Sequence, residues 1–179
     1  MRFDHQAQNE CYMKVWALLI LSIFMNPVHA EFPATSELRT LYYQAASSKI
    51  AANKLQKLLL TVDDNSRQLL ICYKGAAEMM QAKYVLSPVT KFRKFKRGKN
   101  FIESAIASEP ENLEMRFLRY TIQTNLPSFL GYNDRIFADK KMLIENLDEI
   151  YDKNLRQLVV SYLLASKYTT QKERNHIRK

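Results

Sequence analysis

Apolar side chains recur at steps of three and four residues along most of the chain, and no segment alternates in the manner of a strand. This spacing places the apolar residues on one face of an α-helix. It predicts helices over about 36–60, 66–85, 90–108, 110–125, 133–150 and 155–167. Short connections join these segments. We therefore expect an all-α fold of five or six antiparallel helices, arranged either as stacked helical hairpins or as a closed bundle.

The clearest predicted boundary lies between the third and fourth helices. Ser108 is placed to cap the fourth helix, and Glu111 is placed to return the hydrogen bond. An apolar loop over 126–132 follows the fourth helix and is expected to fold back over its junction with the fifth. Asn133 or Asp134 would cap the fifth helix.

The fourth predicted helix is apolar on two sides. One stripe consists of Leu113, Phe117 and Tyr120, and the other of Met115, Leu118, Ile122 and Leu126. Arg116, Arg119 and Gln123 lie between the stripes and cannot all reach bulk water. Asp139 lies among apolar residues of the fifth predicted helix, where an unpaired acid is costly. We therefore predict a polar brace between the two helices, with Asp139 as the partner.

The same polar residues also admit a functional interpretation. An arginine head left open to a cleft could bind a carboxylate or a phosphate with its planar donors. The binding site would then comprise Arg116, Arg119, Gln123, Asn125 and Tyr132. The brace is the favoured interpretation, because buried polar groups are usually satisfied inside the protein. Glu103 and Glu114 are the alternative brace partners.

The N-terminal segment 1–30 has the features of a secretory signal peptide. An apolar run from Val15 to Met25 follows a lysine, and small residues precede a cleavage site after Ala30. The run is well short of the roughly 20 residues that span a bilayer, so no transmembrane helix is expected after cleavage. Acidic residues before Met13 suit a signal poorly, which makes Met13 a candidate start. The prediction is a periplasmic or secreted protein.

Residues 31–168 are predicted to form the helical domain, and 169–179 to form a basic, disordered tail. The tail "TTQKERNHIRK" has a single aliphatic residue, so it offers little apolar surface to bury. Cys72 is the only cysteine outside the signal segment, and its place in a helical pattern predicts a buried core residue. The chain is basic, with a formal net charge of +9.

Two resemblances accompany this pattern. The segment "GKNFIESAIASEPENLEMRFL" resembles a degenerate tetratricopeptide unit, with Gly98, Ala105 and Pro110 at the small-residue and proline positions of that repeat. The segments "YKGAAEMMQAKY", "KFKRGKNFIESAIASEP" and "NLEMRFLRYTIQTNLPSFLGYNDRIFADK" resemble a family of small exported helical proteins of Gram-negative bacteria over about 41–164. That family has no assigned activity. The resemblance implies export and a helical fold, and it transfers no catalytic residue.

The residue inventory argues against most catalytic classes. Outside the signal segment the only histidine is His176, and three glycines cannot supply a phosphate-cradling loop. We therefore expect no metal and no cofactor. An acid pair drawn from Glu78, Glu103 and Glu114 could still cleave a glycosidic bond, which keeps a carboxylate-dependent envelope hydrolase as an alternative function.

The stretch "KFRKFKRGK" carries six basic residues, Lys91, Arg93, Lys94, Lys96, Arg97 and Lys99. Phe92, Phe95, Ile102 and Ile106 share a helical stripe, which predicts that they point into the core and that the bases form its solvated side. The functional alternative is an anionic envelope surface, bound by a peripheral protein. Export argues against nucleic acid as the partner. We expect an exported binding or interaction module, not an enzyme, with a peptide, a protein or an envelope component as its ligand.

Overall fold

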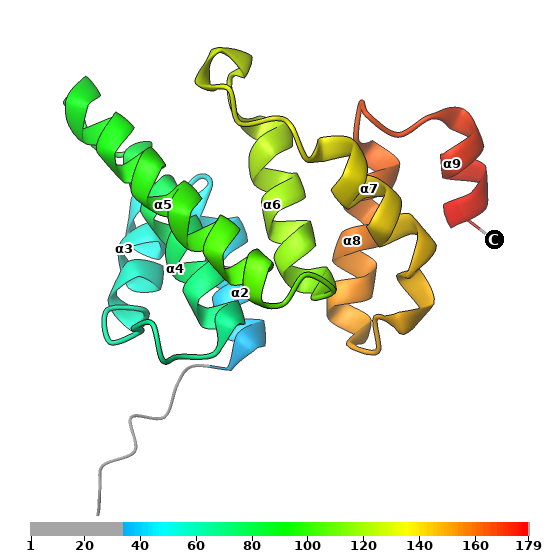
Figure 1. Cartoon of the computed structure of the whole chain (residues 1–179), viewed down its shortest axis with the longest axis horizontal. Helices are drawn as coiled ribbons and strands as arrows, with labels where there is room; N and C mark the ends of the chain where they lie inside the picture. The colour runs from blue at the N-terminus through cyan, green and yellow to red at the C-terminus, as the bar shows by residue number, and fades with distance from the viewer. Residues whose placement is uncertain (1–33, 179) are drawn as a thin grey trace, which may run out of the picture. The chain divides into compact units, whose positions relative to one another are not determined.

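The computed structural model describes residues 34–178, and this range is helical without a strand (Figure 1). The predicted signal peptide lies outside the described residues. The α-helices within that range are α2 (Thr35–Ala45), α3 (Lys49–Leu58), α4 (Gln68–Ala82), α5 (Pro88–Ser108), α6 (Leu113–Asn125), α7 (Ile136–Glu145), α8 (Lys153–Ala165) and α9 (Gln171–Ile177). Two 3-10 turns, η1 (Ser128–Leu130) and η2 (Leu147–Glu149), interrupt the connections. The all-α prediction is confirmed, with eight described helices instead of five or six.

The first predicted helix, 36–60, is in fact two helices, α2 and α3. The chain leaves the helical conformation at Ser48, whose side chain accepts a hydrogen bond from the Ala51 backbone N–H. Serine competes for backbone groups in this way and favours helix starts over helix interiors. The interruption allows α3 to turn back and pack against α2, as the contacts between them require.

The predicted caps of α6 and α7 are wrong. Helix α5 continues through Ser108, and the cap of α6 is Asn112, whose side chain accepts a hydrogen bond from the Met115 backbone N–H at 3.2 Å. Asparagine serves this role as well as serine does. Helix α7 begins after Arg135 without any side-chain cap.

The tail predicted to be disordered contains helix α9. A capping box starts it: Thr170 accepts from the Glu173 backbone N–H, and the Glu173 carboxylate accepts from the Thr170 backbone N–H. The same carboxylate lies 2.7 Å from Lys140, a buried residue of α7. The tail is therefore ordered by polar contacts and by Ile177 packing against the core, which composition alone does not reveal.

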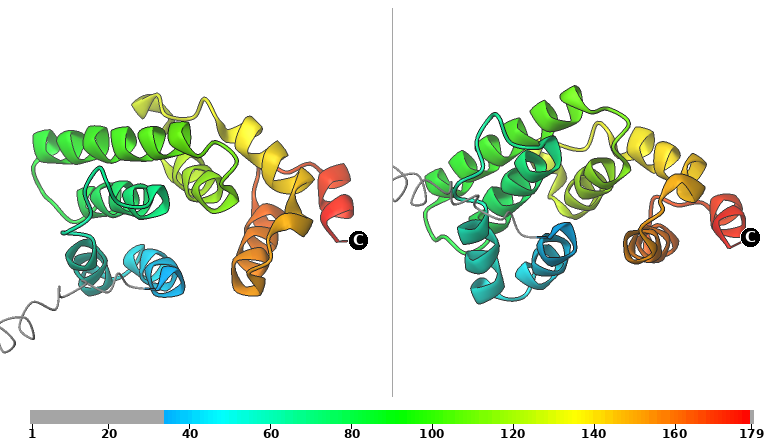
Figure 2. Two further views of the ribbon diagram at one scale, coloured as in Figure 1. Left: turned by 60° about the horizontal axis from the view of Figure 1, so that its bottom comes forward. Right: turned by 90° about the horizontal axis from the view of Figure 1, so that it is seen from below.

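Helix α6 separates two hydrophobic clusters. Its Met115, Leu118 and Ile122 join the cluster built on α2 to α5, and its Phe117 and Tyr120 join the cluster built on α7 and α8. These are the two stripes expected from the sequence. Figure 2 shows α6 between α5 and the α7–α8 pair. A helix apolar on two sides must be covered on both, which explains its buried position.

Helices α4 and α5 approach closely where two glycines meet. A Cβ atom built on Gly98 would lie 2.6 Å from the Gly75 carbonyl oxygen, and one built on Gly75 would lie 2.6 Å from the Gly98 carbonyl oxygen. Neither position has room for a side chain, so the two backbones pack directly together. This contact fixes the position of α5 and of the basic residues that it carries.

Candidate functional site

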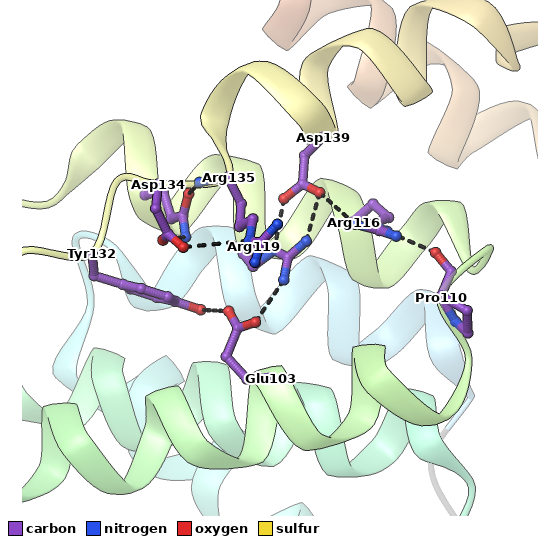
Figure 3. A network of polar contacts seen from close by, with 9 residues as sticks. Glu103, Pro110, Arg116, Arg119, Tyr132, Asp134, Arg135 and Asp139 are labelled. Atoms are coloured by element: carbon purple, nitrogen blue, oxygen red, sulfur yellow. Dashed lines mark hydrogen bonds and ion pairs between the residues drawn. The ribbon is translucent and has the colours of Figure 1, made fainter.

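The predicted polar brace is present, with Arg119 of α6 at its centre (Figure 3). Its guanidinium donates two hydrogen bonds of 2.7 Å to the Asp139 carboxylate and one of 2.7 Å to Glu103. Asp139 is completely buried and Arg119 is 3% exposed. Burial alone would lower the pKa of Arg119, but the bonds and charge of Asp139 raise it above its ordinary value. Arg119 therefore keeps its positive charge inside the domain.

Arg116 completes the brace. It donates to Asp139 at 3.0 Å and to the Pro110 carbonyl at 2.7 Å. Gln123 is buried as well: it accepts from the Arg135 backbone N–H at 3.1 Å, and its side-chain N–H group lies 3.5 Å from Asp134. All three polar residues between the stripes of α6 thus bind groups in neighbouring segments.

The remaining predicted binding residues also have internal partners. Tyr132 donates to Glu103 at 2.5 Å, and its ring packs edge-on against Phe95 at 6.1 Å between centroids. Burial, followed by the bond and charge of Glu103, raises the pKa of Tyr132. Asn125 donates to the Thr121 carbonyl and to the Tyr162 hydroxyl. Each of these groups holds neighbouring helices together.

The brace leaves no free head group for a ligand. In residues 34–178 the only buried side-chain polar atom without a hydrogen-bond partner is Oγ1 of Thr169, which is not part of this network. Both arginines of α6 are paired with Asp139. The geometry thus matches the structural interpretation, whereas the ligand-site interpretation needed an open arginine.

A second buried network was not anticipated from the sequence. Arg39 of α2 donates to both carboxylate oxygens of Glu114, at 3.0 and 3.1 Å, and also to Asp152 at 3.0 Å. Tyr73 of α4 donates to Glu114 at 2.5 Å. Burial and the neighbouring Glu114 charge raise the pKa of Tyr73. The apolar pattern did not mark this arginine, because at about 100° per residue Arg39 lies roughly 160° from Leu41 around α2.

The three acids considered for hydrolysis are all paired with cations. Glu103 binds Arg119, and Glu114 binds Arg39. Glu78 lies 3.2 Å from Lys94 and 3.8 Å from Arg97. The hydrolase hypothesis required two acids facing each other across a cleft with no basic partner. These three acids do not provide such a pair.

The basic segment (Lys91–Lys99) lies on α5 and is mostly exposed. Arg93, Lys96 and Arg97 face solvent, and so does Lys91. The other two bases are half-buried: Lys94 pairs with Glu78, and Lys99 lies 4.8 Å above the Tyr132 ring. This distribution is the solvated basic face predicted from the sequence.

The apolar side of this segment differs from the prediction at one position. Phe95, Ile102 and Ile106 are buried as expected, but Phe92 is 55% exposed. The reason is its place near the start of α5, where less of the domain lies beside the helix. Lys91 is exposed at the same level of the helix. Lys96 stacks over the Phe92 ring at 5.8 Å.

Phe92 belongs to an exposed apolar group that the sequence analysis missed. Leu86 is 97% exposed and Val89 is 75% exposed. We call Leu86, Val89 and Phe92 the apolar corner: Leu86 lies in the connection between α4 and α5, and Val89 and Phe92 lie in the first turns of α5. The spacing of three residues from Val89 to Phe92 places these two on one face of α5, whereas Leu86 precedes the helix.

A cavity of about 270 Å³ opens where α3, α4 and α5 meet. It is lined by Gln56, Leu59, Leu60, Lys74, Ala77, Glu78, Lys94 and Arg97. Typical ligand pockets occupy roughly 300–1,000 Å³, and the buried acid here already binds two cations. The cavity therefore adds little to the case for a small-molecule site.

Within residues 34–178, no group of acidic, histidine or cysteine side chains is arranged to hold a metal ion. None of the helices in that range combines the length and apolar character needed to cross a bilayer. Cys72 is free and fully buried, and burial raises the pKa of its thiol. Comparison of the chain with protein-family models, with curated proteins and with solved structures finds no match.

Proposed function

We propose that this chain is an exported binding module that attaches to an anionic component of the cell envelope through the basic segment (Lys91–Lys99) of α5. The observation that carries the proposal is the exposure of four of the six bases on one rigid helix. No acid lies between Glu78 and Glu103 in the sequence. Glu78 lies 3.8 Å from Arg97, whereas Lys91, Arg93 and Lys96 form no ion pair with an acid of residues 34–178. Export rests on the signal-like segment 1–30.

The arrangement of the other charges supports a binding role over catalysis. The buried carboxylates Asp139, Glu114 and Glu78 are each held by an arginine or lysine, which leaves them no free proton-transfer role. Arg119 and Arg39 are bound to these carboxylates, Arg119 to Asp139 and Arg39 to Glu114. Exposed bases occur elsewhere as well, but on α5 four of them, Lys91, Arg93, Lys96 and Arg97, lie within seven residues of one helix.

The test is sedimentation of the chain beginning at Glu31 with lipid vesicles. Zwitterionic phosphatidylcholine vesicles are compared with vesicles that contain anionic phosphatidylglycerol, at increasing salt concentrations. We expect binding only to the anionic vesicles, with a steep loss as salt rises, because exposed charges are screened within about 10 Å at 0.1 M.

A matched pair of variants tests the location of the site. Lys91→Gln/Arg93→Gln/Lys96→Gln removes three exposed bases from the segment, and each base near an anionic surface is worth about fivefold in affinity. We expect a loss of roughly 100-fold. The control removes three exposed bases elsewhere, Lys49, Lys57 and Lys153. Equal losses in both variants would show that net charge alone drives binding, and absence of anionic binding would refute the proposal.

A further inference from the structure

We infer that the apolar corner (Leu86, Val89 and Phe92) inserts into the interfacial layer of an anionic lipid bilayer. This inference rests on the proposed function and names the partner as a membrane rather than a soluble polyanion. Three large apolar side chains within seven residues are exposed at one turn of the fold, with exposed fractions of 97%, 75% and 55%. A cluster of this kind marks an interaction surface, whereas single exposed apolar residues are ordinary.

The other exposed apolar residues form no comparable group. Ile50 and Leu60 lie at the beginning of α3 and just past its end. Phe129 lies in η1, Phe137 in α7, and Tyr151 between η2 and α8. Phe137 has a base beside it, since Lys140 lies 5.6 Å from its ring centroid, but Lys140 is buried and paired with Glu173. The apolar corner is different because seven lysines and arginines, and no acid, occupy the stretch between Glu78 and Glu103.

The charge around the corner specifies an anionic partner. Lys91 and Arg93 flank Phe92 in the sequence, and Lys96 lies over its ring at 5.8 Å. Apolar side chains that insert at the level of the headgroups, beside bases that reach phosphates, are the hallmark of interfacial membrane segments. A bilayer of zwitterionic lipid would accommodate the apolar side chains but would offer no net negative charge to the neighbouring bases.

The shape of the corner favours a bilayer over a peptide. Leu86 is almost completely exposed, so no neighbouring side chain forms a groove around it. A peptide ligand needs such a groove, whereas a fluid lipid layer adapts to a protruding point. The cavity described above lies on another side of α5, because its lining residue Lys94 is about 200° from Phe92 around the helix at roughly 100° per residue.

The composition of the chain allows a direct measurement of insertion. Trp16, in the predicted signal segment, is the only tryptophan. In the full chain carrying Trp16→Phe, the substitution Phe92→Trp places a single fluorophore at the corner. Tyr151→Trp places the control fluorophore at a residue that is 90% exposed and far along the chain from the basic segment.

We expect the tryptophan at position 92 to shift its emission to shorter wavelength on anionic vesicles, and to be quenched by lipids brominated near the top of their acyl chains. The tryptophan at position 151 is expected to show neither change. Because the readout is local, attachment of the N-terminal apolar run to the vesicles would not produce this difference.

A second pair of variants measures the contribution of the corner to affinity. Leu86→Ser/Val89→Ser removes two inserted side chains, and we expect vesicle affinity to fall at least tenfold. Ile50→Ser/Leu60→Ser is the matched control, with two apolar residues that are 83% and 67% exposed and no expected loss. Binding to soluble polyphosphate should be unchanged in both variants, since it depends on the bases alone.

The outcomes separate this inference from the proposed function. Salt-sensitive binding that needs the basic segment, without quenching at position 92, would overturn insertion and leave the proposed function intact. Equal loss of vesicle and polyphosphate binding in Leu86→Ser/Val89→Ser would also overturn insertion. If the basic segment has no effect on vesicle binding, both proposals fall.

Discussion

Arg119 joins three segments that are distant in the sequence. Its five N–H donors in one rigid plane reach Asp139 on α7 and Glu103 on α5 at the same time. Lysine could not span this geometry, because its ammonium group is a single point of charge. The presence of Arg116 on the same carboxylate increases the positive field around Asp139. The buried acid is thereby compensated on both oxygens.

Replacement of this acid is expected to destabilise the protein strongly. Asp139→Asn leaves the buried Arg119 without its main counter-charge, and we expect a loss of about 3–5 kcal/mol in the free energy of unfolding. The measurement is chemical denaturation. The control is Asp148→Asn, which breaks an exposed pair with Arg156 and should cost below about 1 kcal/mol. Similar losses in both variants would mean that the brace contributes no more than a surface ion pair.

At the scale of elements, backbone contact and capping decide where the helices lie. The approach of α4 to α5 depends on two glycines that are poor helix formers but leave room for each other. Helix α9 depends on a capping box and on one ion pair with α7, not on an apolar stripe. In both cases the local sequence disfavours the helix, and contacts with a distant segment stabilise it.

The close contact between Gly75 and Gly98 predicts whether Gly98→Ala stabilises or destabilises the protein. Helix propensity alone says that Gly98→Ala should stabilise α5 by about 1 kcal/mol. The added methyl group would lie 2.6 Å from the Gly75 carbonyl oxygen, so we expect a net loss of roughly 1–3 kcal/mol instead. Thermal and urea unfolding measure the difference. The companion variant Ala107→Gly, at an exposed position of α5, should lose about 1 kcal/mol from propensity alone. A stabilised Gly98→Ala variant would refute the close contact.

Helix α9 is predicted to loosen in acid. Burial alone would raise the pKa of Glu173, but Lys140 and the capping contacts lower it overall. Its contribution to stability is therefore present above the ordinary glutamate value of about 4.3 and is lost as pH falls through the lower value of the folded state. The protection of the α9 amides, meaning their hydrogen exchange compared with that of an unstructured peptide at the same pH, should fall in that range before the core opens.

Substitution of Glu173 tests whether its carboxylate is the group that makes α9 sensitive to acid. Glu173→Gln should lower the protection of the α9 amides at neutral pH and abolish the further loss of protection in acid. Glu145→Gln removes only an exposed carboxylate 3.8 Å from Lys141 and should change neither. Unchanged exchange in the Glu173 variant would show that apolar packing, for example of Ile177, holds α9 by itself.

At the scale of the whole described domain, α6 connects two cores and the charged networks tie its edges to its neighbours. The Arg119 network joins α6 to α5 and α7, and the Arg39 network joins it to α2 and to the start of α8. These networks account for the interior charges of α6. The bases of α5 are left outside them, and this separation of structural from exposed charge is the basis of the proposed envelope attachment.

The sequence by itself determined the helical class, the two apolar stripes of α6 and the need for an internal partner for its arginines. Those features follow from periodicity and from the cost of burying charge, both of which are local properties of the chain. Asp139 could be identified because its apolar neighbours Ile136 and Leu143 marked a buried position.

Tertiary structure alone decided the break at Ser48, the order in α9, the pairing of Arg39 with Glu114 and the exposure of Phe92. Each depends on which distant segment lies nearby: Lys140 is 33 residues from Glu173, and Arg39 is 75 residues from Glu114. Phe92 satisfies the same helical pattern as Phe95, but only the latter is covered by the domain. A periodic pattern defines which face of a helix is apolar, whereas the extent of the neighbouring elements defines how far along the helix that face is buried.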